Sequence, residues 1–100
     1  MENVRIDLRK LPADIGILFF DKNDRMPTRY YNDTEIEKVW DHIEEKIVGK
    51  QDVDLLVVGY MPIIMPAKLA AYAVDAGVMS FSICRPGGLV ENVYDWRRNN

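Results

Sequence analysis

The chain has 100 residues, of which 48% are hydrophobic, and its 13 basic and 16 acidic side chains leave a formal net charge of −3. This length fits one domain with one core. The charge balance argues against a protein that coats long duplex nucleic acid through a broad basic face, but it leaves room for a small anionic ligand held by two or three residues.

The single cysteine, Cys84, cannot form an internal disulfide, which is typical of a reducing compartment. No apolar stretch reaches the roughly 18 residues that a membrane helix needs, and the first residues lack the apolar region of a signal peptide. We therefore expect a cytoplasmic protein without a membrane partner.

Two strands are predicted near the start of the chain. Residues 3–9 alternate apolar and polar side chains, which predicts a strand with one solvated face. Residues 15–20 form an unbroken apolar run, which predicts a strand covered on both faces. We expect the two strands to pair as an antiparallel hairpin or to lie as near neighbours.

One helix is predicted after a polar loop over residues 21–33. Thr34 and Glu37 have the spacing of a capping box, in which each side chain satisfies a backbone amide at the start of a helix. Apolar residues then follow with helical spacing through residue 47, and Gly49 is placed to stop the helix. The sequence therefore predicts a helix over 34–48.

The second half carries only nine charged side chains and supplies most of the predicted core. Residues 53–58 and 78–84 predict apolar strands, and residues 66–76 predict a helix between them. That helix is apolar on nearly every side, so it is either sandwiched or part of a subunit interface. Residues 89–94 predict a short last strand, and residues 95–100 a polar tail.

This order of elements, ββαβαβ(β), predicts a small Rossmann-like three-layer α/β domain that spans residues 1–100. Each strand–helix–strand connection is long enough for a right-handed crossover between parallel strands. We expect a mostly parallel central sheet with an antiparallel edge, and we place the antiparallel strand at the start of the chain.

Ligands of open α/β sheets bind beyond the carboxyl ends of the parallel strands. Three loops are predicted there, 21–24, 59–62 and 85–88. The second loop leads into the start of the apolar helix, where free amides favour an anion. Together with Lys68 and Arg85, this loop predicts a phosphate site.

Each residue of this site also has a structural interpretation. Gly59 can simply permit a tight strand-to-helix turn, and Tyr60 can be a boundary aromatic rather than a ring that stacks on a base. Lys68 can be a solvated helix residue. Arg85 and the glycines at 87 and 88 can form only a turn, and neither of the glycine-rich phosphate motifs occurs in the chain.

Catalytic and metal motifs are scarce. His42, the only histidine, is predicted on the surface of the first helix, and Cys84 at the end of a strand is predicted as a small core residue. The spacings typical of zinc sites are absent. Four carboxylates remain as candidate ligands of a hard cation: Asp21, Asp24, Asp33 and Asp75. A metal-assisted phosphodiesterase that uses Asp21 or Asp24 is therefore a third hypothesis, after the two given below.

One run in the second half resembles a known family. A strand ending in glycine, a loop to Pro-Ile, an apolar helix, a strand and a Pro-Gly turn follow one another at residues 55–64, 67–76, 81–84 and 85–88. This run resembles the small stand-alone CRISPR-accessory proteins of the CARF (CRISPR-associated Rossmann fold) superfamily. We mean the ring-nuclease type, which binds cyclic tetra-adenylate or RNA tetranucleotides between subunits.

Two departures from that family bear on activity. The family carries a histidine soon after Pro-Ile, whereas Ile64, Met65 and Pro66 follow Pro62-Ile63 in this chain. Arg85 stands where the family pattern has an aspartate. The resemblance thus implies that binding is retained while hydrolysis is in doubt. It implies no cofactor, except manganese if the protein is a nuclease.

The resemblance implies a homodimer or homotetramer that binds cyclic oligoadenylate or short adenine-rich RNA in antiviral defence. Lys68 and Arg85 would bind phosphates, and the apolar helix would contact a second subunit. The implied ligand-binding residues are Gly59, Tyr60, Met61, Lys68, Arg85, Gly87 and Gly88. The alternative is a non-catalytic homo-oligomeric interaction subunit with no small ligand, which no nucleotide would stabilise.

Overall fold

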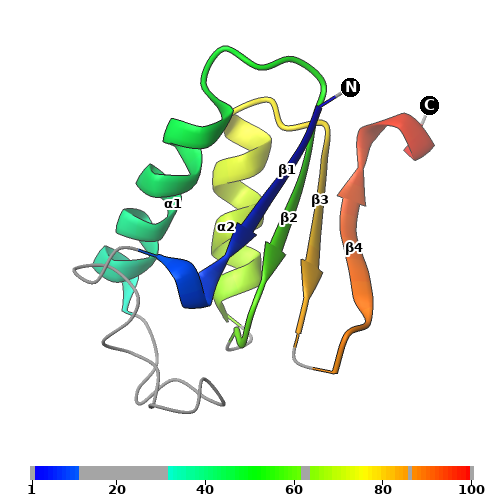
Figure 1. The fold of residues 1–100 in the computed structure, drawn as a ribbon. Helices are drawn as coiled ribbons and strands as arrows, with labels where there is room; N and C mark the ends of the chain where they lie inside the picture. Colours follow the sequence, from blue (N-terminus) through cyan, green and yellow to red (C-terminus); the bar gives the residue numbers. More distant parts are fainter. Residues whose placement is uncertain (1, 12–31, 62–63, 86, 100) are drawn as a thin grey trace.

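The computed structural model describes residues 2–11, 32–61, 64–85 and 87–99. Four strands and two helices follow in the order β1 (Glu2–Asp7), α1 (Asp33–Ile47), β2 (Val53–Val58), α2 (Ile64–Asp75), β3 (Ser80–Cys84) and β4 (Val90–Asp95) (Figure 1). Short 3₁₀ turns follow β1 at Leu8–Lys10 and β4 at Trp96–Asn99. None of the helices in these described ranges is long and apolar enough to cross a membrane.

The strands form one sheet in the order β1-β2-β3-β4. β1 and β3 both run parallel to β2, and β4 runs antiparallel to β3 with an irregularity between Phe81 and Ser82. The prediction of an α/β domain with a mostly parallel sheet and an antiparallel edge is therefore confirmed.

The place of the antiparallel strand was predicted wrongly. β1 pairs in parallel with β2, in a register that sets Glu2 opposite Val53 and Asp7 opposite Val58, and the antiparallel edge is β4 at the other end of the chain. The reason is that α1 separates β1 from β2 and brings the chain back to the end of the sheet where β1 began. The predicted strand over 15–20 and the loop over 21–24 lie outside the described residues.

The core lies between one face of the sheet and the two helices. Along β2, Val53, Leu55 and Val57 are buried, while the residues between them point to the other face and are half-buried. Both helices lie on the same face of the sheet (Figure 1), and the rings of Trp40 in α1 and Tyr72 in α2 stack at 5.7 Å. The described residues place no helix on the opposite face.

The helix α1 was predicted to within one residue, but its cap was not. Asn32 rather than Thr34 caps the helix, because its side-chain oxygen accepts from the Glu35 amide while the Glu35 carboxylate accepts from the Asn32 amide, both at 2.9 Å. The capping box therefore lies two residues earlier than predicted. Buried residues then recur on one side of α1: Ile36, Val39, Trp40, Ile43 and Ile47.

The helix α2 begins at Ile64, two residues before the predicted start. Pro66 is therefore the third helical residue, a position at which the missing amide hydrogen has no partner within the helix to lose. Met65, Pro66, Leu69 and Ala73 are buried, whereas Ile64 and Val74 are exposed. Within the described residues α2 is thus covered on one side only.

Candidate functional site

The carboxyl ends of the three parallel strands lie together at one end of the sheet, as the phosphate-site prediction requires. The register sets Asp7 beside Val58 and Val58 beside Cys84. The Gly59 amide donates to the Cys84 carbonyl at 3.0 Å, which continues the pairing of β2 and β3 by one residue. Arg85 is therefore adjacent to the loop that leads from β2 into α2.

Gly59 has a structural role at this end of the sheet. Its φ is +141°, a conformation that residues with a side chain rarely adopt, and a Cβ atom added there would lie 3.0 Å from the Leu8 Cβ. The Leu8 side chain is completely buried. The glycine thus allows the chain after β2 to pass directly over the 3₁₀ turn that follows β1.

The two residues after Gly59 face the core to different degrees. Met61 is only 2% exposed and belongs to the hydrophobic core. Tyr60 is half-buried and packs against the same core. Of the implied ligand-binding residues Gly59, Tyr60 and Met61, only Tyr60 therefore presents a side chain to a ligand at this end of the sheet.

Both predicted phosphate-binding cations have carboxylate partners. The Lys68 ammonium pairs with Asp33, so it joins α2 to the first residue of α1. The Arg85 guanidinium pairs with Glu91 of β4 at 3.3 Å. Because both carboxylates are more than half exposed and exposed ion pairs contribute only about 0–1 kcal/mol, a phosphate can replace either partner. Lys68 lies in the second turn of α2, not in the first turn as predicted.

The glycines at 87 and 88 form part of the tight turn between β3 and β4. Both have positive φ values, +111° and +89°, and the Gly88 amide donates to the Arg85 carbonyl at 3.1 Å. Both are exposed. They direct the chain into β4 and in this way place Glu91 next to Arg85.

The other candidate residues that the structure describes, His42, Cys84, Asp33 and Asp75, form no metal cluster at this end of the sheet. Among the described residues, no group of three or more His, Cys, Asp and Glu side chains could hold a metal ion. His42 is half-exposed on α1, and the Cys84 thiol lies 3.8 Å from the Arg85 carbonyl oxygen. Asp33 is the partner of Lys68, Asp75 is exposed at the end of α2, and Asp21 and Asp24 lie outside the described residues.

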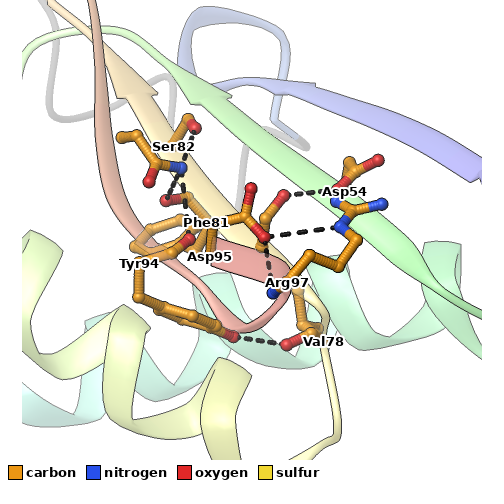
Figure 2. A network of polar contacts seen from close by, with 9 residues as sticks. Asp54, Val78, Phe81, Ser82, Tyr94, Asp95 and Arg97 are labelled. Carbon is orange, nitrogen blue, oxygen red and sulfur yellow. Dashed lines mark hydrogen bonds and ion pairs between the residues drawn. The ribbon is translucent and has the colours of Figure 1, made fainter. Parts of the chain in front are cut away.

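A polar network that the sequence did not predict lies at the opposite end of the sheet. Asp54 accepts from the Ser80 hydroxyl and pairs with Arg97, which also pairs with Asp95 at 3.3 Å (Figure 2). Asp54 could have been singled out from the sequence, because it is a charged residue within an otherwise apolar strand. Arg97 was assigned to a polar tail, because sequence spacing alone does not reveal a partner 43 residues away.

A second group of contacts in this region fixes β4. The Tyr94 hydroxyl donates to the Val78 carbonyl at 2.7 Å, and the Asn92 amide group donates to the Ser82 hydroxyl at 3.0 Å and to the Tyr94 carbonyl at 3.1 Å (Figure 2). These contacts span the irregularity in the pairing of β3 and β4. Each of these hydrogen bonds joins two groups of the chain itself, which is typical of a structural network.

Comparison with known proteins identifies no relative of this chain. A scan against protein-family models found no match. Searches of the curated proteins and of the solved structures found none either. The family resemblance is therefore carried only by the residues of the second half that were described above.

Proposed function

We propose that this chain is a Rossmann-like module that binds a cyclic oligoadenylate or a short adenine-rich RNA, as a homo-oligomer in a CRISPR-type defence system. The observation that carries the proposal is the position of Arg85 beside the loop from β2 to α2, where the Gly59 amide donates to the Cys84 carbonyl. Ligands of open α/β sheets bind at this end of the sheet. The family resemblance supplies the class of ligand.

The roles of the residues follow from their chemistry. The planar guanidinium of Arg85 can donate two parallel hydrogen bonds to one phosphate, and the ammonium of Lys68 supplies a second positive charge. The half-exposed ring of Tyr60 offers an apolar surface for a base. Hydrolysis is not part of the proposal, since no histidine follows Pro62-Ile63 and no residue is assigned a catalytic role.

A ligand panel in a thermal unfolding experiment tests this function. The panel contains cyclic oligoadenylates, linear oligoadenylates and mononucleotides, each with and without manganese. A ligand present at a hundred times its Kd stabilises the folded state by about 2.7 kcal/mol, which raises the Tm of a domain of this size by roughly ten degrees or more. If no member of the panel raises the Tm, the proposal is overturned.

Substitution of Arg85 tests the site itself. Arg85→Ala is expected to weaken binding of the active ligand by about 1–3 kcal/mol, because a charge-assisted hydrogen bond to phosphate is lost. Glu91→Gln removes the internal partner of Arg85 and is expected to leave binding equal or tighter. Arg97→Ala is the control, since Arg97 is also ion-paired but lies at the opposite end of the sheet. Unchanged affinity in Arg85→Ala, measured calorimetrically, would remove Arg85 from the site.

The outer side of α2 favours a second candidate function, that of an interaction subunit without a small ligand. Ile64 is 52% exposed and Val74 is 43% exposed, and the exposed Ala67 and Ala71 lie between them with helical spacing. This function predicts a stable oligomer that Ala71→Glu dissociates and that no nucleotide stabilises. Light scattering on both proteins, with and without the ligand panel, separates the two functions.

A further inference from the structure

An open groove of about 600 Å³ follows the outer edge of β1, between this strand and α1. Its lining includes five consecutive residues of β1, Asn3–Asp7. We call it the β1–α1 groove and define it by its basic side chains: Arg5, Lys10, His42, Lys46 and Lys50. It follows an edge strand of the sheet, and its Asp7 and Lys10 end lies next to the 3₁₀ turn that the loop from β2 to α2 crosses.

The basic side chains form two walls. Arg5 and Lys10 come from β1 and the turn after it, whereas His42 and Lys46 come from α1, with Lys50 shortly after the end of that helix. His42 and Lys46 are four residues apart on α1, which corresponds to a rise of about 6 Å along the helix. A polyanion that lies along the groove therefore meets Lys10 on one side and His42 and Lys46 on the other, while Arg5, which is paired with the outward-pointing Leu56, extends from the face of the sheet opposite the two helices.

The acidic groups near the groove are already engaged. The Asp7 carboxylate accepts from the Arg9 side chain and amide, and the Glu2 carboxylate pairs with Lys50 and accepts from the Gln51 amide. Partial burial on its own would raise the pKa of Asp7, but the hydrogen bonds and charge of Arg9, with a contribution from Lys10, hold it below its usual value. Asp7 thus stays ionised and bound to Arg9.

Three cations of the groove have no such internal partner. In the parts of the chain that the structure describes, no carboxylate pairs with Arg5, Lys10 or Lys46. All three side chains are exposed. In a chain whose formal net charge is −3, this local excess of positive charge creates a potential that attracts an anionic partner.

We propose that the β1–α1 groove binds the phosphate backbone of a short single-stranded RNA. Each phosphodiester carries its charge in the backbone and presents two free oxygens, so successive phosphates along the groove can accept hydrogen bonds from either wall. An acidic peptide added along β1 would direct only alternate side chains toward α1. The six residues of β1 span about 20 Å, which limits the contact to a few nucleotides.

The composition of the lining defines the mode of binding. Among the described residues of the lining, only His42 carries a ring on which a base can stack, so most of the contacts are to the phosphate backbone. Recognition is therefore by backbone charge, tolerant of sequence and strongly dependent on salt. The groove is a second anion-binding surface, and it does not depend on the cyclic-ligand site of the proposed function.

Fluorescence anisotropy with a labelled short linear oligoadenylate tests the groove. Wild type is compared with Lys10→Gln, Lys46→Gln and the double variant over a series of salt concentrations. Each single variant is expected to weaken binding about three- to tenfold and to reduce the slope of log K against log salt by about one. The matched control is Lys38→Gln, which removes the same charge from an exposed site two turns earlier on α1 and does not line the groove.

Three results would overturn the proposal. One is that the wild type does not bind the oligoadenylate even at low salt. Another is that Lys38→Gln weakens binding as much as Lys46→Gln, which would indicate only diffuse attraction to the whole surface. The third is that polyglutamate, and not RNA, binds to wild type and binds more weakly to Lys10→Gln and Lys46→Gln than to Lys38→Gln. That result would indicate an acidic protein partner. Circular dichroism confirms that each variant is folded, and cyclic oligoadenylate binding, measured in parallel, reports separately on the Arg85 site.

Discussion

Gly59 combines a backbone requirement with a packing requirement at one residue. Its φ of +141° disfavours any side chain, and the adjacent Leu8 leaves no room for one. The sequence could predict the first of these, because a glycine between a strand and a helix marks a tight turn. It could not predict the second, because Leu8 is 51 positions away and reaches Gly59 only through the parallel pairing of β1 with β2.

Gly59→Ala is expected to lower the free energy of unfolding by about 2–4 kcal/mol, since backbone strain and overpacking against Leu8 add together. For a domain of this length each kcal/mol lowers the Tm by about 4–8 °C. Gly49→Ala is the matched control, because its φ is +80° but nothing lies within 4 Å of the added Cβ. Thermal unfolding should therefore show a clearly smaller loss for Gly49→Ala. Equal losses would mean that Leu8 moves aside at no cost.

At the scale of elements, the sequence predicts those whose signal is local. The apolar run of β2 was predicted with its observed bounds, and α1 to within one residue. The cap of α1 was misplaced because Asn32, Asp33 and Thr34 follow one another, with glutamates at the right spacing for either Asn32 or Thr34. The structure selects Asn32, whose side chain accepts from the Glu35 amide.

Elements and site residues that depend on distant contacts were predicted less well. The residues from 95 onward were assigned to a polar tail, yet Asp95 ends β4 and Arg97 pairs with Asp54. Met61 was assigned to a pocket, although it is 2% exposed. A methionine after Gly-Tyr looks the same in sequence whether it turns toward a ligand or toward the core.

Tyr94 fixes β4 to the chain that precedes β3. Its hydroxyl donates to the Val78 carbonyl, and its ring lies between Phe81 and Trp96. Burial raises the pKa of this phenol to about 12 from 10.0. Because the folded-state pKa lies above the unfolded value, the contribution of the neutral phenol to stability is complete below pH 10 and is lost as the pH rises toward 12.

Tyr94→Phe removes this hydroxyl and is expected to lower the free energy of unfolding by about 1 kcal/mol at neutral pH. Denaturant unfolding of both proteins between pH 9 and pH 12 is the measurement, with values spanning the phenol's titration range. The difference in the free energy of unfolding between wild type and Tyr94→Phe should shrink as the pH rises, because only wild type loses the stabilising neutral phenol. A difference that stays constant up to the highest pH would show that folding does not raise the pKa of this phenol.

At the scale of the whole molecule, the two ends of the sheet have different roles. The carboxyl ends of β1, β2 and β3 carry the candidate ligand residues, and both termini lie at the other end (Figure 1). There Asp54 of β2 joins Ser80 of β3 and Arg97 of the final turn. The network thus fastens the end of the chain to its middle, at the opposite end of the sheet from Arg85.

Asp54→Ala should reveal how far this network stabilises the fold. It removes the acceptor of the Ser80 hydroxyl, which belongs to a residue only 7% exposed, together with the partner of Arg97. The expected loss is about 1–3 kcal/mol, because a buried hydroxyl is left without an acceptor and a charged hydrogen bond is broken. Asp41→Ala, at an exposed position on α1, is the control and should change stability little.

A double-mutant cycle with Arg97→Ala separates the two contacts of Asp54. If the ion pair couples the C-terminal turn to the sheet, Asp54→Ala should cost less in the Arg97→Ala background than in wild type, and denaturant unfolding of the four proteins measures the difference. An equal cost in both backgrounds would mean that Ser80 alone accounts for the role of Asp54. In that case the antiparallel edge would be held by Tyr94 and the β3–β4 pairing without help from Arg97.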